Sequence, residues 1–341
     1  MAVLKNIARR LTGIAVWILV PALFLWAVGA IYYLRPLPAW FRQPLAFLLL
    51  ATAVIGLLRM RPHSRWLVFA GAASGIIYLL TWLQQPSNDR DWAADNQRTA
   101  TVRVADDNVH IANFRHTVFR SADDCDVHYS DLTFHLSELD RVWFVVQRFT
   151  ALEGIAHNFL TFSRTTPEGQ RFFSVSVEIR RERGEEFDPL KGLYRQYELI
   201  YVIADERDAI GSRTVIRPDD RVYLFPVNAT AQDVQNLFVD IAGRVNRLQQ
   251  QPEFYHSLLN NCTNNIVLHA YRFTAHPISS FDPRIIAPGF ADRLACAQGL
   301  IGSPGESFAD LRHRCRIDEI ARAVGLTEAF STRIRSLQQP E

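Results

Sequence analysis

The sequence predicts an α+β protein in which three N-terminal transmembrane helices precede one large domain of antiparallel strands and helices. Long apolar runs are confined to residues 1–85. Polar and apolar residues alternate in short segments after residue 100, and a helical period begins at Ala231. Hydrophobic residues make up 48% and charged residues 21% of the 341 residues, which excludes a largely disordered chain.

The apolar runs are typical of membrane-spanning helices. We expect transmembrane helices over about residues 11–34, 42–60 and 66–83, because a hydrocarbon core of about 30 Å needs roughly 20 apolar residues in a helix. A cleaved signal peptide is the alternative for the first run. However, its uncharged stretch exceeds the usual apolar core of about 7–15 residues, and two further runs follow. We therefore interpret residues 1–85 as a membrane anchor.

Basic residues determine the expected orientation of this anchor. Three precede the first run: Lys5, Arg9 and Arg10. Three lie between the second and third runs: Arg59, Arg61 and Arg65. Between the first and second runs we count only Arg35 and Arg42. Because Lys and Arg favour the cytoplasmic side, the N-terminus should be cytoplasmic. Three crossings then place the rest of the chain on the outer side, unless the second run does not span.

A polar linker over residues 86–100 and one extracytoplasmic domain over residues 101–341 should follow the anchor. Alternation indicates strands over residues 101–104, 109–114, 155–163, 172–180, 197–204 and 222–226. Residues 139–149 fit either a strand or a helix. The domain therefore begins mainly with antiparallel strands.

Helices should follow these strands. Apolar residues recur at helical spacing over residues 231–249, and Pro252 should end that helix. A further helix should begin near Asn261, with Ile266, Val267 and Ala270 facing inward.

Composition and motifs exclude several classes of function. A formal net charge of +2 gives no general case for nucleic-acid binding. Four cysteines without a C-x-x-C pair disfavour a zinc ribbon, although Cys296 and Cys315 could pair in an oxidising compartment, leaving Cys125 without an obvious partner. The acidic segment Asp205–Asp208 fits a cluster of ion pairs better than a metal site. We expect no metal and no cofactor.

Cys262 is the sharpest candidate for chemistry, because it directly follows two good helix N-cap residues. The free N–H groups and positive dipole of a helix start favour a thiolate, and the same groups can bind an oxyanion. Asn261 and Thr263 are therefore the candidate residues of the helix N-terminus and oxyanion site. The alternative is a small buried cysteine of the core.

His157 is the best-placed candidate base, since it lies in a predicted strand. If Thr166–Gly169 form a four-residue hairpin loop, cross-strand pairs sum to 335, so that Ser163 faces Phe172 and His157 faces Glu178. Glu178 could then orient the imidazole, as the third member of a triad does. The alternatives are a structural histidine, and a salt bridge from Glu178 to a neighbouring arginine.

Three stretches resemble a known family. They are AHNFLTF around His157, SVSVEIRRERGEEFDPLKGLYRQYELIYVIADERD and PEFYHSLLNNCTNNI. They resemble the DUF4105 family, the periplasmic domain of the Bdellovibrio-type lipoprotein N-acyltransferase, over about residues 113–271. The resemblance implies a permuted NlpC/P60-like (papain-related) cysteine fold, in which the histidine strand precedes the cysteine helix. In that family the membrane helices follow the periplasmic domain, whereas here three precede it.

The resemblance also implies an activity. We expect a multi-pass protein of the bacterial inner membrane whose periplasmic domain is a cysteine acyltransferase, with Cys262, His157 and Glu178 as catalytic residues. It would move an acyl chain from a phospholipid or lipoprotein donor to a lipoprotein N-terminal amine. The alternatives are a cysteine peptidase or amidase acting on cell-wall peptide, and a non-catalytic membrane protein that binds lipid or a partner.

Overall fold

The computed structural model describes residues 2–59, 64–121, 124–149, 151–271, 278–279 and 282–336. The chain divides into two compact units. The first comprises Met1–Pro86 and Asp188–Gln196, and the second comprises Ser87–Phe187 and Tyr197–Glu341. The first unit thus includes a segment that interrupts the second unit in sequence.

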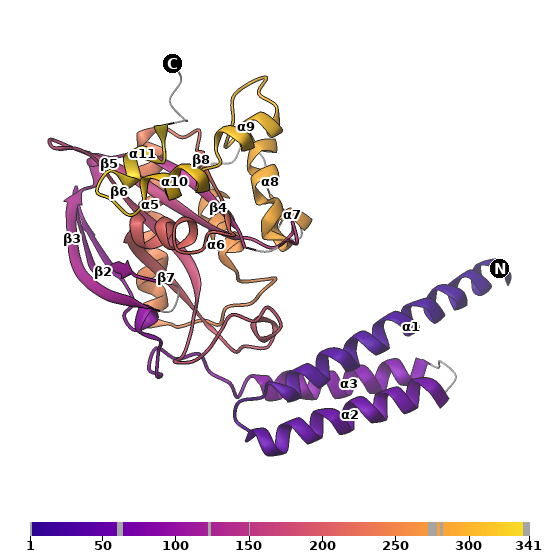
Figure 1. Ribbon diagram of the computed structural model, residues 1–341. Coiled ribbons are helices and arrows are strands. Elements are labelled where there is room, and N and C mark those ends of the chain that lie inside the picture. Colours follow the sequence, from indigo (N-terminus) through magenta and orange to yellow (C-terminus); the bar gives the residue numbers. More distant parts are fainter. Residues whose placement is uncertain are drawn as a thin grey trace. The chain divides into compact units, whose positions relative to one another are not determined.

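Three helices form the first unit: α1 (Ala2–Tyr32), α2 (Ala39–Arg59) and α3 (Ser64–Thr81). α1 lies against both of the others (Figure 1). Their contacts bury small side chains such as Ala27, Ala46 and Ala70, while large apolar side chains such as Leu25 and Phe47 are exposed. Small residues between helices and large apolar residues outside are typical of helices packed in lipid.

The three expected membrane spans differ in how well the structure supports them. Among the described residues, only Ala39–Gly56 of α2 is both long and apolar enough to cross a membrane. In the other two helices, the apolar segments that fall within the described residues, Val16–Tyr32 and Val68–Thr81, are shorter. The second run, which seemed the weakest from its sequence, is therefore the best supported, and a multi-pass anchor is not shown.

The segment Asp188–Gln196 contains a short 3-10 turn, Lys191–Leu193, and packs on the ends of the helices of its own unit. The ring of Tyr194 stacks on Tyr33, with centroids 5.3 Å apart. A Cβ at Gly29 would collide with the Tyr194 ring, so this contact requires glycine in α1. Gln196 Nε2 donates a hydrogen bond to the carbonyl of Tyr33 at 2.9 Å.

An eight-stranded mixed sheet forms the centre of the second unit (Figure 1). The strands are β1 (Thr101–Ala105), β2 (Asn108–Phe119), β3 (Cys125–His135), β4 (Leu139–Arg148), β5 (His157–Thr166), β6 (Gly169–Arg180), β7 (Glu198–Asp205) and β8 (Arg221–Pro226). Their order is β1-β2-β7-β6-β5-β4-β8, and β3 also pairs with β2. All pairings are antiparallel except β2 with β7. The predicted α+β class is confirmed, with one parallel pairing that we did not expect.

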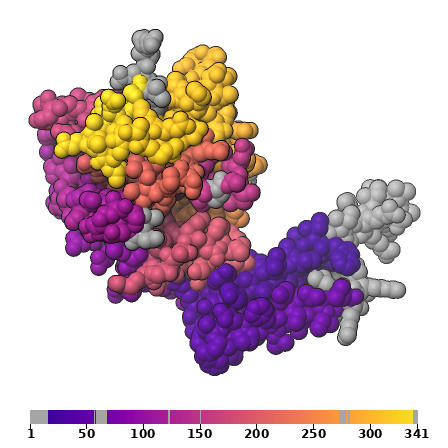
Figure 2. Space-filling model, viewed as in Figure 1, coloured from indigo at the N-terminus to yellow at the C-terminus, as the bar shows by residue number. Residues whose placement is uncertain are grey.

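Helices and turns cover both faces of the sheet. They are a π-helical turn (Arg207–Gly211), α4 (Ser212–Thr214), α5 (Ala231–Gln250), α6 (Cys262–Ala270), α7 (Pro283–Ile286), a 3-10 turn (Pro288–Phe290), α8 (Ala291–Ala297), α9 (Phe308–Arg314), α10 (Asp318–Val324) and α11 (Phe330–Arg333). In the space-filling view the yellow C-terminal residues lie over part of the second unit, beside the magenta residues of the sheet (Figure 2). The sheet is therefore the middle layer of three.

Two apolar clusters fill the space between these layers. We call the side where the sheet packs on α5, α6 and α8 the α5 face, and the side covered by α10, α11 and the Arg207–Thr214 segment the α10 face. In β4, Val142 and Phe144 belong to the α5 face, whereas Trp143 and Val145 belong to the α10 face. A strand that is buried on both sides is apolar throughout. This explains why the pattern of residues 139–149 did not distinguish a strand from a helix.

Residues 87–100, where we expected a linker, pack against the second unit. The indole of Trp92 is buried beneath the guanidinium of Arg180, 4.2 Å from the ring centroid. Arg180 Nε donates a hydrogen bond to the carbonyl of Asn96 at 3.0 Å. This segment is therefore part of the folded structure.

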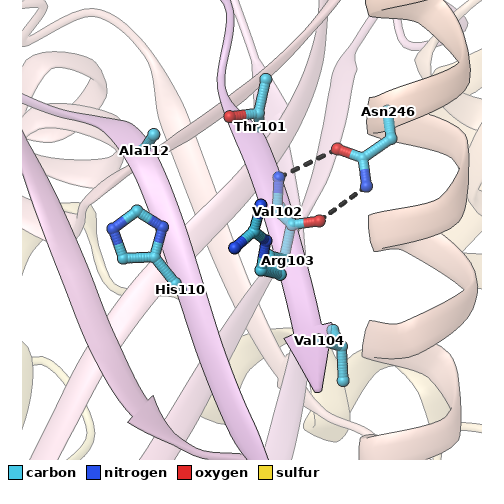
Figure 3. Close-up of a pocket in the computed structure, with 7 residues that line it drawn as sticks. All are labelled: Thr101, Val102, Arg103, Val104, His110, Ala112 and Asn246. Carbon is cyan, nitrogen blue, oxygen red and sulfur yellow. Dashed lines mark hydrogen bonds between the residues drawn. The ribbon is translucent and has the colours of Figure 1, made fainter.

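A side-chain amide occupies part of the outer edge of the sheet (Figure 3). Asn246 of α5 accepts a hydrogen bond from the N–H of Val102 at 2.9 Å and donates one to its carbonyl at 2.6 Å. The amide thus replaces a neighbouring strand at this position. An edge strand whose groups are satisfied in this way is less open to pairing with another chain.

Candidate functional site

The three candidate catalytic residues lie at the ends of their elements. His157 is the first residue of β5, Glu178 lies near the end of β6, and Cys262 is the first residue of α6. The predicted register of β5 and β6 is confirmed, because Ser163 pairs with Phe172 and all pairs sum to 335. The loop is tighter than expected, since Thr166 and Gly169 are themselves paired.

The His157 imidazole contacts two side chains of the neighbouring strand. Its Nε2 atom lies 2.8 Å from Ser176 Oγ and 3.8 Å from Glu178 Oε1. The Ser176 hydroxyl also bonds to the Glu178 carboxylate, so its oxygen can accept a hydrogen bond from Nε2. Nδ1 then carries the lone pair and makes no hydrogen bond to a described residue. Sequence analysis missed Ser176, although alternation places it on the same side of β6 as Glu178.

Arg213 of α4 is the principal partner of Glu178. Its Nη2 donates a hydrogen bond to Glu178 Oε1 at 2.7 Å, and its Nε donates one to Gln147 Oε1 at 2.8 Å. The guanidinium lies over the ring of Phe159, 5.2 Å from the centroid. A salt bridge from Glu178 to the next arginines in sequence is therefore wrong. Tertiary structure supplies the partner from another element.

Burial and this ion pair determine the protonation of the cluster. Burial alone would raise the pKa of Glu178, but Arg213, His157 and Arg115 outweigh it and the pKa is lowered. Burial, and to a smaller extent Arg213, lower the pKa of His157 to about 3 against the opposing effect of Glu178. At neutral pH the carboxylate is therefore ionised and the imidazole is neutral.

Cys262 is buried at the N-terminus of α6, with 3% of its surface exposed. Asn261 caps this helix: its side chain accepts a hydrogen bond from the N–H of Asn264 at 3.0 Å, and Asn264 Oδ1 accepts one from the N–H of Asn261. Burial raises the pKa of the thiol, while the N–H groups of Asn158, Thr263 and Cys262 itself lower it by a smaller amount. The helix N-terminus lowers the pKa of the thiol, as predicted, but burial has the larger effect and keeps the thiol protonated.

Asn158 connects the histidine strand to the cysteine helix. Its backbone N–H points at the Cys262 sulfur. Its Nδ2 donates hydrogen bonds to Thr263 Oγ1 at 2.8 Å and to the carbonyl of Pro288 at 2.9 Å. Thr263 is thus held by a side chain that sequence analysis did not identify, although Asn158 directly follows His157.

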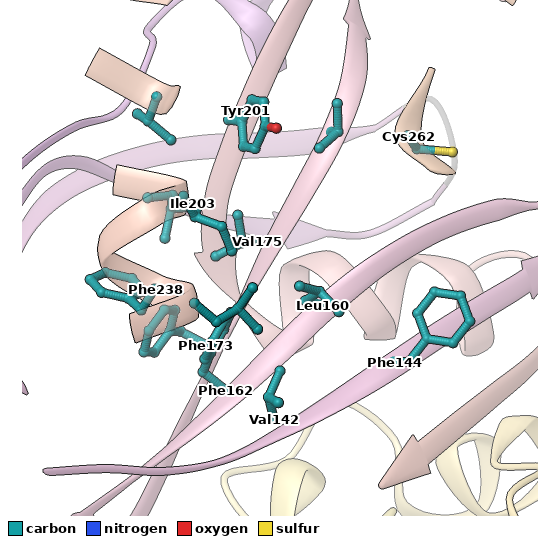
Figure 4. Close-up of a cluster of buried hydrophobic side chains, with 14 of the residues drawn as sticks. Val142, Phe144, Leu160, Phe162, Phe173, Val175, Tyr201, Ile203, Phe238 and Cys262 are labelled. Atoms are coloured by element: carbon teal, nitrogen blue, oxygen red, sulfur yellow. The ribbon is translucent and has the colours of Figure 1, made fainter. Parts of the chain in front are cut away.

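The imidazole and the thiol belong to different faces of the sheet. The His157 ring stacks on Phe159 of the α10 face, with centroids 5.5 Å apart, whereas Cys262 belongs to the cluster of the α5 face. Figure 4 shows Cys262 at the margin of that cluster, away from Phe162, Phe173 and Phe238. No hydrogen bond joins the ring to the sulfur, and the group of β5 that lies beside the sulfur is the backbone N–H of Asn158, the residue after His157.

The histidines close to Cys262 in sequence have other partners. His256 Nδ1 accepts hydrogen bonds from the N–H groups of Leu258 and Leu259, both at 3.2 Å. His269 is buried, with Nδ1 2.7 Å from Asp240 Oδ2 and Nε2 2.8 Å from the hydroxyl of Tyr201. His157 therefore remains the candidate base.

An apolar cavity of ≈ 360 Å³ lies at the start of α6, although Cys262 itself does not line it. Thr263, the neighbour of Cys262, lines it together with Phe144 and Leu160 of the sheet. Ile266, Val267 and Ala270 of α6, which we expected to face inward, also line it and are only partly buried, because they face this space. The volume is in the range of pockets for small organic ligands.

The acidic segment after β7 forms ion pairs, as interpreted from the sequence. Asp205 pairs with Arg207, Glu206 pairs with Arg335, and Asp208 pairs with Arg115. In the described part of the chain, no group of three or more His, Cys, Asp or Glu side chains could hold a metal ion. The cysteines Cys125, Cys262, Cys296 and Cys315 are all free.

Comparison with known families gives a match over part of the chain. Residues 126–284 match the family model of the Lnb N-terminal periplasmic domain. The assignment to DUF4105 is therefore wrong, because the matching model is that of the Lnb domain. The match includes His157, Glu178 and Cys262, and it describes this region as similar to a periplasmic domain. No curated protein and no solved structure matched the chain.

Proposed function

We propose that this protein is a membrane-anchored thiol acyltransferase that carries an acyl chain on Cys262. The observation that carries this proposal is the apolar cavity lined by Thr263, the residue that follows the cysteine. A fatty acyl chain whose carbonyl lies at the thiol needs an adjoining apolar space, and the cavity beginning at Thr263 provides one. A peptidase or amidase acting on cell-wall peptide would instead need polar groups along this space.

In the first step, the thiol attacks the ester of a phospholipid or lipoprotein donor. In this scheme the imidazole, which rests on the opposite face of the sheet, turns toward the thiol at the start of β5, and the Cys262 proton passes to His157 as the sulfur bonds to the ester carbonyl carbon. The carbon–oxygen bond then breaks, and the departing alkoxide takes the proton from the imidazolium. The products are the acyl thioester and an alcohol. Glu178 orients the ring and stabilises its cation in this scheme.

In the second step, a lipoprotein N-terminal amine attacks the thioester. The carbon–sulfur bond breaks, an amide forms, and the amine proton passes through His157 to the sulfur. The N–H groups of Cys262 and Thr263 at the start of α6 are the donors proposed for the oxyanion in both steps. Asn261 contributes by capping the helix that presents them.

The uncharged resting forms of Cys262 and His157 suit a buried site. A buried thiolate and imidazolium would each have to leave water, and the pKa directions of Cys262 and His157 both favour the uncharged forms. Proton transfer then accompanies attack on the ester. The charge that develops on the imidazole is opposite Glu178, which is already ionised.

The proposed topology follows from the apolar helices and the matched family. We place three helices in the inner membrane, with the N-terminus in the cytoplasm and the second unit in the periplasm. The order of His157, Glu178 and Cys262 along the chain agrees with a permuted NlpC/P60-like arrangement. The acyl donor would then be a lipid of the same bilayer, and tethering raises its effective concentration.

The direct test is detection of the thioester. Cells expressing the full chain are fed an alkynyl fatty acid, and the purified protein is tested for label that hydroxylamine removes. We expect label in the wild type and none in Cys262→Ser. Cys315→Ser is the matched control, because Cys315 is a buried cysteine of the same apolar cluster, and it should label normally.

The role of the base is tested in the same assay. His157→Ala should lower the labelling rate at least 100-fold, in line with general-base contributions of about 10²–10⁴. Labelling that persists in Cys262→Ser would refute a Cys262 thioester. An unlabelled wild type, in cells where a known thioester enzyme is labelled, would favour a hydrolase with water as acceptor.

A further inference from the structure

Loops with exposed apolar side chains gather at the end of the sheet that carries the candidate site. β4 and β6 end there, while β5 and β7 begin there, because these strands are paired antiparallel. The loops at this end expose Phe149 after β4 and Phe187 after β6, with 36% and 42% of their surfaces accessible. The turn before α6 exposes Leu258 and Leu259, with 42% and 67% accessible. We call these four side chains the apolar rim.

Specific contacts hold the apolar rim in place. The rings of Phe149 and Phe187 meet edge to face, with centroids 6.4 Å apart. The turn from His256 to Asn260 is closed by two backbone hydrogen bonds of 3.1 and 3.0 Å. Inside this turn, Nδ1 of His256 accepts hydrogen bonds from the backbone N–H groups of Leu258 and Leu259. The fold therefore orders this turn while leaving both leucine side chains exposed.

The chain itself indicates what covers the apolar rim. Phe187 is bonded to Asp188, where the chain enters the helical unit, and the chain returns at Tyr197, just before β7. The other connection is Pro86 to Ser87, and the N–H of Ser87 donates to Glu198, the first residue of β7, at 3.3 Å. All three connections to the unit that contains the candidate membrane span thus leave from this end of the sheet.

We infer that the apolar rim inserts into the interfacial layer of a lipid bilayer and thereby presents the Cys262 site to lipid esters. Scattered exposed leucines are ordinary, but a group of large apolar side chains around one site is typical of a binding surface. A bilayer fits this group better than a protein partner does, because the rim is covalently joined to the apolar helices. The inference rests on the proposed function for its substrate, and it specifies how that substrate is reached.

Photo-crosslinking tests the insertion without using the thiol. p-Benzoylphenylalanine is placed at Phe187 or Leu259 in the full chain carrying Cys262→Ser. The protein is reconstituted in nanodiscs of phosphatidylethanolamine and phosphatidylglycerol (3:1) containing an alkyne-tailed phospholipid. Val118 and Val239 are the matched control positions, since they are also exposed apolar residues, on β2 and α5.

We expect lipid adducts at Phe187 and Leu259 at five or more times the yield at the two control positions. Equal yields at all four positions would overturn the inference, and so would adducts to a second copy of the chain in place of lipid. Because Cys262 is replaced throughout, this result does not depend on acyl transfer. A failure here is therefore distinguishable from a failure of the proposed function.

A kinetic experiment separates insertion from a structural effect. Leu258→Ser with Leu259→Ser should lower thioester formation from vesicle phospholipid at least fivefold, while labelling of Cys262 by a water-soluble short-chain acyl ester stays unchanged. Val239→Ser is the control and should alter neither rate. Equal loss with both donors would show that the leucines support the site itself, and would contradict the inference.

Discussion

The two faces of the sheet are both apolar and buried, yet they bury very different polar groups. On the α10 face, three arginines pair with carboxylates: Arg115 with the buried Asp208, Arg335 with the buried Glu206, and Arg213 with the partly buried Glu178. The α5 face also buries an ion pair, Arg148 with Asp292, and in addition it carries an apolar cavity of ≈ 360 Å³ lined by Thr263, the residue after Cys262. The α10 face thus fixes more charges in place, and the α5 face also leaves space.

This difference assigns a separate task to each face. Buried ion pairs with several hydrogen bonds have few alternative geometries, so the α10 face orients the imidazole. An unfilled cavity forgoes packing contacts, so the α5 face is the less stable of the two and the better suited to a ligand. The candidate site is assembled where the two faces meet, at the first residues of β5.

The largest expected effect comes from breaking a charge pair on the α10 face. Arg335→Ala leaves the Glu206 carboxylate buried without its arginine, which should lower the free energy of unfolding by about 3–5 kcal/mol. Thermal unfolding of the full chain in detergent measures this change. Arg333→Ala, an exposed arginine two residues away, should change stability by less than about 0.5 kcal/mol. Similar losses in both variants would show that the pair contributes little.

The next effect concerns the orientation of His157. Glu178→Gln keeps the shape of the side chain but removes its charge, so the imidazolium that forms during acyl transfer loses its counter-ion. We expect the rate of thioester formation to fall about 100-fold, as measured by the labelling rate. Glu186→Gln, an exposed position on the loop after β6, should leave the rate unchanged. An unaltered rate in Glu178→Gln would remove this residue from the mechanism.

The pH dependence of stability tests the burial of the imidazole. His157 binds a proton near pH 6.5 when unfolded but only near pH 3 when folded. The unfolded state therefore gains protons first as the pH falls, and stability decreases from about pH 7 toward pH 3. Between pH 7 and pH 5 this group should contribute a loss of about 2 kcal/mol. His157→Gln should show a correspondingly smaller loss of stability, and an identical loss in both proteins would contradict the burial of the ring.

The smallest expected effect comes from filling the cavity of the α5 face. Val267→Phe places a larger side chain in the lining, so labelling with a long acyl chain should fall several-fold while a short-chain acyl ester still reacts. The change in stability should be about 1 kcal/mol or less. Leu268→Phe, at an exposed position of the same helix, should affect neither chain length. Equal reactivity of both donors in Val267→Phe would show that the cavity does not hold the chain.

Local patterns in the sequence were sufficient to predict the β5–β6 hairpin and the two longer helices of the second unit, α5 and α6. The register of β5 and β6 follows from one short turn and a period of two, and the cap at Asn261 follows from residue type. The candidate histidine, carboxylate and cysteine came from the same local reasoning. What the sequence could predict here depends on neighbours within a few positions.

Features that depend on tertiary structure were missed. Arg213 is 35 residues from Glu178 and reaches it only through the fold. β3 is an edge strand with a largely exposed pattern, so it lacks a buried face to mark it. The pKa of Cys262 was misjudged because burial depends on the packing of α6 against the sheet, which a helix N-terminus does not reveal.

The position of Asn158 has a consequence for the order in which the protein is made. Its amide group joins three segments, with partners 105 and 130 residues further along the chain. Contacts of such long range form late, because a large loop must close before they form. A nascent chain that has emerged only as far as α6 lacks the Pro288 carbonyl, so the nucleophile is not yet enclosed. Under the proposed function, Cys262 would become competent for acyl transfer only after almost the whole domain has been synthesised.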